Sequence, residues 1–108
     1  MTAANREEAA RIADMLVASR LAACVQIMPE MQSVYRWHGK IERAAEVLLI
    51  AKTVASKFEA LEREVRALHS YETPEIVAVP MAATSAPYLA WLMESVISQP
   101  TESLAGKT

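Results

Sequence analysis

The chain has 108 residues, a length that fits one domain and leaves little room for two. Its hydrophobic fraction of 53% includes twenty alanines, so the composition overstates the apolar core that it can build. The net charge of −2 is spread along the chain, which argues against a nucleic-acid or anionic-membrane partner. No apolar run reaches the ~18 residues of a membrane span. The only cysteine, Cys24, cannot form an internal disulfide and favours a reducing cytosol.

The first predicted element is an amphipathic helix from Asn5 to Arg20. Asn5 can cap its free N–H groups, and Glu8 three places later completes a capping-box-like pair. Apolar residues then recur at steps of three and four. Three strands are predicted to follow, at Ala23 to Met28, Gln32 to His38 and Glu46 to Thr53, with Gly39-Lys40 marking a turn.

A second helix is predicted from about Val54 to His69, with a stripe of Phe58, Leu61, Val65 and Leu68. Glu75 to Met81 is a further strand, in which Pro80 indicates a sheet edge. The third helix follows its N-cap Ser85, and its first turn contains Pro87. Its predicted inward residues are Tyr88, Leu89, Leu92 and Val96. Residues 1–98 form one predicted domain, and 99–108 a loose polar tail.

This order of elements lacks a strand before the first helix. Residues 1–4 match only the last step of such a strand, so the first strand is expected to be missing or truncated.

Five short motifs, in the right order, resemble the CutA divalent-cation tolerance family over nearly the whole chain. They are R-L-A-A-C-V-Q-I (20–27), S-V-Y-R-W-H-G-K-I (33–41), L-L-I-A-K-T (48–53), H-S-Y-E-T-P-E-I (69–76) and Y-L-A-W-L (88–92). The resemblance implies an α+β ferredoxin-like βαββαβ domain with an extra C-terminal helix, similar to the PII signalling proteins and assembled as a homotrimer. It also implies a role in tolerance of copper and other divalent metals, and not an enzyme.

The chain departs from the family pattern at three positions. Gln26 stands where asparagine is usual, and Ser70 stands where proline usually follows the histidine. Met1 occupies a position at which some members carry a cysteine, so an inherited copper site would have lost one ligand.

Two residues are candidate metal ligands. Family members proposed to hold Cu(II) use the histidine that corresponds to His69, although a histidine at a helix C-terminus also interacts favourably with the helix dipole. Cys24 is either a soft copper ligand or a buried thiol that packs as a small hydrophobe. A Cu(I) site at Met28 and Met31 has little support, because methionines at strand ends usually fill gaps.

A second group is a candidate ligand cleft between subunits: Tyr35, Trp37, Lys52, Glu72 and Glu75. Alternation places the two aromatic residues on one face of a strand, and Lys52 in an apolar strand needs a carboxylate or water. The group is either a polar cluster that fixes the trimer or a cleft for a small anion or a metal.

These observations predict a cytosolic, homotrimeric, metal-responsive protein that binds a metal or small ligand at subunit junctions. The alternatives are a trimeric adaptor with an indirect link to metals and a PII-like small-molecule sensor. No serine lies in a strained glycine-flanked turn and no base lies near Cys24 in the sequence, so nothing supports nucleophilic catalysis.

Overall fold

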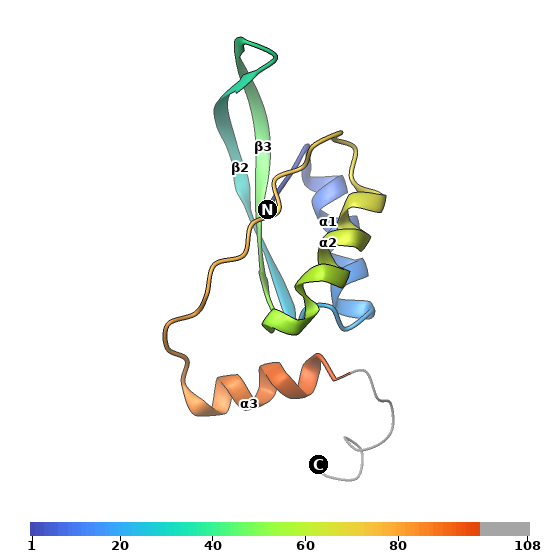
Figure 1. Cartoon of the computed structure of the whole chain (residues 1–108), viewed down its shortest axis with the longest axis vertical. Helices are drawn as coiled ribbons and strands as arrows, with labels where there is room; N and C mark the ends of the chain where they lie inside the picture. The colour runs from blue at the N-terminus through green and yellow to red at the C-terminus, as the bar shows by residue number, and fades with distance from the viewer. Residues whose placement is uncertain (98–108) are drawn as a thin grey trace.

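The computed structural model of the chain describes residues 1–97 (Figure 1). A three-stranded antiparallel sheet, in the order β1-β3-β2, carries α1 and α2 on one side, while α3 lies apart beyond one end of the hairpin. The elements are β1 (Thr2–Ala3), α1 (Arg6–Ala18), β2 (Cys24–Trp37), β3 (Lys40–Lys52), a 3-10 turn η1 (Ala55–Lys57), α2 (Phe58–Leu68) and α3 (Ala86–Ser95). The predicted tail, 99–108, lies outside the described residues.

Helix α1 begins as the sequence predicts. The Asn5 side chain accepts a hydrogen bond from the Glu8 N–H at 2.8 Å, which satisfies one of the free donors of the first turn. The reciprocal half of the capping box differs, because the Glu8 carboxylate accepts from the Ala4 N–H and not from Asn5. The buried face of the helix then points at the sheet, through Ala9, Ile12, Ala13 and Leu16.

Strands β2 and β3 form a hairpin much longer than the sequence predicts (Figure 1). The two predicted strands on either side of Pro29 are one strand, and β3 begins at Lys40 instead of Glu46. Proline cannot donate to a ladder, but the register shifts between Ile27 and Glu30, and this irregularity accommodates Pro29 within the strand. The far half of the hairpin extends beyond α1 and α2, so the ladder and not core burial holds it together.

The hairpin turn lies at His38 and Gly39, one residue earlier than predicted. Both residues have positive φ, +49° and +77°, and Trp37 pairs directly with Lys40. A two-residue loop with positive φ at both positions has type I′ geometry, whose twist matches that of the strands.

The main core lies between the sheet and the two helices. It contains Ala3 of β1, Val47 and Leu49 of β3, and inward residues of α1 and α2. Of the predicted α2 stripe, Leu61 and Val65 are buried, whereas Leu68 is 39% exposed.

Helix α3 is attached by a separate, smaller cluster. Leu92 and Val96 pack on Ala23, and the Arg20 guanidinium donates to the Ser95 carbonyl at 3.1 Å. The prediction that Leu89 faces inward is wrong, since its side chain is 40% exposed.

The α+β class is confirmed, but one predicted strand is absent. Residues 75–81 form no strand. Strand β1 is short, because only Thr2 and Ala3 pair with β3, opposite Leu48 and Val47. It therefore offers only two residues with which the segment 75–81 could pair. Pro80, which lacks an N–H, weakens the segment further as a ladder partner.

None of the helices described in residues 1–97 has the length and apolar character that a membrane span requires.

Two substitutions test the turn. Gly39→Ala should destabilise the protein by about 1 kcal/mol, because a Cβ at this positive φ is strained although no neighbouring atom obstructs it. His38→Asn should instead stabilise slightly, since Asn-Gly is the preferred type I′ pair. Urea denaturation measures both. Equal effects of the two variants would contradict the type I′ assignment.

Candidate functional site

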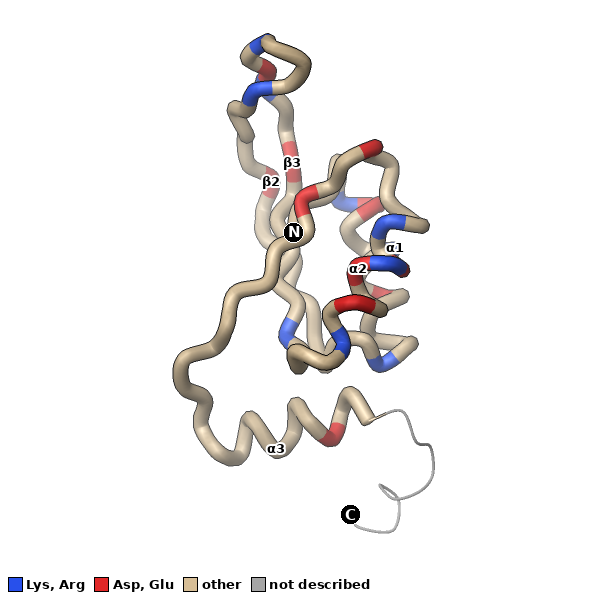
Figure 2. Tube along the Cα trace, in the orientation of Figure 1, with Lys and Arg blue, Asp and Glu red and all other residues tan. Residues whose placement is uncertain are grey.

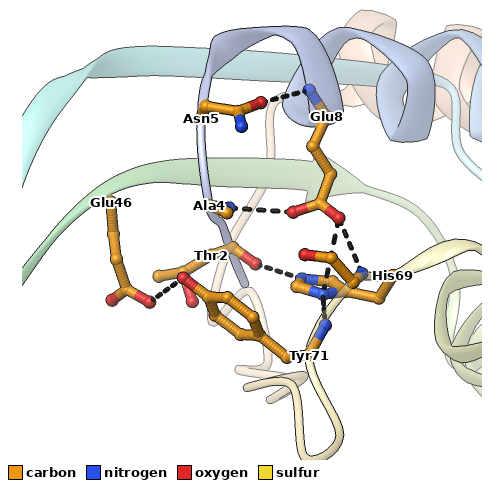
Figure 3. Close-up of polar contacts among 8 residues, drawn as sticks. Thr2, Ala4, Asn5, Glu8, Glu46, His69 and Tyr71 are labelled. Carbon is orange, nitrogen blue, oxygen red and sulfur yellow. Dashed lines mark hydrogen bonds and ion pairs between the residues drawn. The ribbon is translucent and has the colours of Figure 1, made fainter.

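The carboxylate of Glu8 is buried at the junction of β1, α1 and the end of α2 (Figure 3). Its side chain is only 2% exposed. One oxygen accepts from the Ala4 N–H at 2.8 Å and the other from the Ser70 N–H at 2.7 Å. The carboxylate thus ties the start of α1 to the chain that leaves α2.

Ser70 can make this bond because it is not proline. The resemblance noted in the sequence implies a proline here, and proline carries no N–H. Ser70 supplies a donor to the buried carboxylate that a proline could not supply.

These contacts decide the charge of Glu8. Burial alone would raise its pKa, but the hydrogen bonds from Ala4 and Ser70 outweigh burial and lower the pKa below its ordinary value. The ionised form is therefore the one that the fold stabilises.

His69 lies beside Glu8, with its side chain 1% exposed. It is the C-cap of α2, and its backbone turns to an extended conformation so that the ring folds back against β1. Nε2 lies 2.8 Å from the Thr2 carbonyl oxygen, and Nδ1 accepts from the Tyr71 N–H at 3.0 Å. Because Nδ1 is an acceptor, the ring carries its proton on Nε2 and donates it to Thr2. The 3.8 Å contact between Nδ1 and Glu8 is then not an ion pair.

Tyr71 extends the cluster to β3. Its hydroxyl donates to the carboxylate of Glu46 at 2.8 Å, and Glu46 is itself buried (Figure 3). Burial, with the adjoining Glu46 carboxylate, raises the pKa of Tyr71. We call Thr2, Glu8, Glu46, His69, Ser70 and Tyr71 the junction cluster.

The residues of the predicted ligand cleft do not meet within one chain. Tyr35 and Trp37 lie near the hairpin tip, where Trp37 pairs with Lys40. Lys52 lies at the other end of β3, opposite Cys24, twelve residues away along the strand, or roughly 40 Å. A site that combines them would need more than one copy of the chain.

The remaining candidates are dispersed as well. The Lys52 ammonium donates to the side-chain oxygen of Gln26, so its partner is an amide and not a carboxylate. Glu72 and Glu75 are both exposed on the segment after α2.

Cys24 is partly buried under α3. Its sulfur lies 3.7 Å from the Tyr88 hydroxyl, and this hydrogen bond raises the pKa of Tyr88. Within residues 1–97 no three His, Cys, Asp or Glu side chains are grouped so as to hold a metal ion.

Apart from His69, the residues of the junction cluster were not predicted from the sequence. A usable signal was present: Glu8 precedes Ile12 and Leu16 at steps of four, so it lies on the apolar stripe of α1. A charged residue on such a stripe is buried and must be paired. Glu46, at the start of the apolar part of β3, has the same character.

The helix pair over an antiparallel β1-β3-β2 sheet defines a ferredoxin-like α+β protein. Among known proteins, the model of the family described as "CutA1 divalent ion tolerance protein" matches residues 1–95. The chain belongs to this family.

Individual proteins named CutA are similar to this chain in sequence and in structure. Divalent-cation tolerance protein CutA of Thermus thermophilus is 46% identical over 95 residues, which cover 88% of this chain and 92% of that protein. A solved structure titled periplasmic divalent cation tolerance protein CutA, from Archaeoglobus fulgidus, has a TM-score of 0.86 and 45% identity, covering 89% of this chain and 93% of that one. Chloroplastic CutA 1 of rice is 43% identical over 88% of this chain, but the chain spans only 54% of its length.

The Glu8 carboxylate should be essential to stability. Glu8→Gln replaces one acceptor oxygen by an NH₂ group that faces an N–H donor, and should cost about 2 kcal/mol or more in the free energy of unfolding. Glu7→Gln, an exposed neighbour, is the matched control and should change it by less than about 0.5 kcal/mol. Equal denaturation midpoints for the two variants would contradict the role of the buried carboxylate.

The lowered pKa of Glu8 also predicts a dependence on pH. A carboxyl whose pKa is lower in the folded than in the unfolded protein stabilises fully above the unfolded value of about 4.3, and loses this contribution as the pH falls through its folded value. The destabilisation by Glu8→Gln should therefore shrink below about pH 4. Thermal denaturation of the unaltered protein and of Glu8→Gln, at a series of pH values, measures this change. A difference in stability that does not vary with pH would refute the lowered pKa of Glu8.

Proposed function

We propose that the chain contributes to divalent-cation tolerance by binding a metal ion, Cu(II) first among them, or a small ligand, at the junctions between subunits of a homotrimer. The family match over residues 1–95 carries this proposal. The relatives' names describe tolerance and not a reaction, which favours binding over catalysis.

The exposed surface supports self-association. Strand β2 is an edge of the sheet over its 14 residues, and unpaired edges recruit further strands. The segment after α2 exposes Val77 and Val79 at 65% and 80%. Large exposed apolar areas of this kind mark protein contacts.

Light scattering tests the assembly. We expect the mass of three chains at micromolar concentration, and Val79→Lys should lower it by placing a charge in the contact. Val17→Lys, a half-exposed valine on α1, is the control and should leave the mass unchanged. A monomeric mass for the unaltered protein would refute the trimer.

A metal site at such a junction would draw donors from several chains, since residues 1–97 of one chain group no three of them. His69 would have to exchange its Thr2 carbonyl for the metal, a cost that predicts weak binding. Glu72 and Glu75 are exposed and carry oxygen donors without this cost. Cys24 adds a soft donor, on condition that the thiol leaves Tyr88.

Calorimetry with Cu(II) tests the metal role. His69→Gln keeps an NH₂ group that can donate to Thr2 but removes the imidazole, so Cu(II) affinity should fall about tenfold while the fold persists. Glu59→Gln, on the exposed side of α2, is the control. If the unaltered protein binds no Cu(II) more tightly than about 1 mM, the metal proposal fails. Capture of one specific protein partner without metal would then favour the adaptor.

The compartment remains a prediction. The single cysteine favours the cytosol, whereas relatives are named chloroplastic and periplasmic.

A further inference from the structure

A shallow pocket lies between the outer side of α2 and the segment that follows it. Its larger part has a volume of about 380 Å³ and an adjoining part about 210 Å³. The two parts share Glu62, Arg66, Glu72 and Pro74, so they form one depression.

The pocket presents charges of both signs in equal number. Figure 2 shows basic and acidic residues close together along α2. Two arginines, Arg63 and Arg66, and two glutamates, Glu62 and Glu72, line the larger part.

The existing ion pairs are weak enough to exchange. Arg66 lies 3.5 Å from Glu62, with the two side chains 61% and 37% exposed. Arg63 lies 3.6 Å from Glu64, which is outside the pocket. Exposed pairs of this kind contribute little, so a ligand can replace them. Within residues 1–97 Glu72 has no ion pair.

The wall opposite α2 is fixed. Tyr71 lines the pocket and is held by the Glu46 carboxylate, and the preceding turn is tied to Glu8 through Ser70. Ala67 and Pro74 add small apolar surfaces. The pocket is therefore formed before any ligand arrives, which reduces the ordering cost of binding.

We infer that this pocket binds a small zwitterion, a molecule with a carboxylate and an ammonium group a few bonds apart, such as a free α-amino acid. A simple anion would draw Arg66 from Glu62 and leave that carboxylate unpaired, and a simple cation would do the reverse. A zwitterion replaces both halves of the pair, its carboxylate on Arg66 and its ammonium on Glu62 and Glu72. The pocket shares Glu72 with the proposed metal site, so the zwitterion is tested with metal ions removed.

Amide NMR of the full chain, passed over a chelating resin to remove metal ions, tests it. Added L-alanine should produce saturable shifts at the amides of Ala67, Tyr71 and Glu72. Acetate and methylammonium, which each carry one of the two charges, should bind about tenfold more weakly. Equal shifts with acetate alone would overturn the zwitterion in favour of a plain carboxylate site.

Two arginine variants localise the effect. Arg66→Gln should weaken L-alanine binding about tenfold, whereas Arg11→Gln, an exposed arginine on α1, should leave it unchanged. Absence of saturable shifts, or equal binding by both variants, would overturn the proposal. Since metal is removed, neither result bears on the Cu(II) titration.

Discussion

The buried carboxylate of Glu8 is the constraint on which the arrangement of β1, α1 and the end of α2 depends. An ionised group in the interior is very costly unless hydrogen bonds compensate it. Here the compensating donors, Ala4 and Ser70, are 66 residues apart in the sequence, so only the folded chain can supply both. His69 adds a third tie, from its ring to the Thr2 carbonyl of a strand that is only two residues long. The cluster thus reinforces a short strand that otherwise has two ladder pairs and the two backbone hydrogen bonds between Met1 and Leu49.

This arrangement changes what the histidine can do. In the sequence His69 is the better of the two candidate metal ligands, but in the fold both of its ring nitrogens are engaged and its side chain is almost completely buried. A metal would compete with the contacts that hold β1. The carboxylates of Glu72 and Glu75 are exposed, so a metal that bound them would not compete with these contacts.

Much of the fold could be predicted from local pattern, because periodicity and capping are local. The Asn5 cap, the buried faces of α1 and α2 and the position of the turn near Gly39 all follow from residue spacing. The single long strand through Pro29 could not be predicted, because the register irregularity that admits a proline depends on its partner strand. The absent strand at 75–81 likewise depends on how much ladder β1 offers, which its own sequence does not state. In the candidate site, His69 could be predicted from the sequence because it lies in one of the motifs that resemble the family. Its partners were not, because the contacts with Glu8 and Thr2 join distant parts of the chain.

The most direct test of this account is the protonation of the His69 ring, read from its two nitrogen chemical shifts by long-range ¹H–¹⁵N NMR on the intact protein. We predict a single tautomer, with the proton on Nε2 and an acceptor Nδ1, in slow exchange with water. A proton on Nδ1, or a ring that averages between both forms, would contradict the junction cluster and restore His69 as a free ligand.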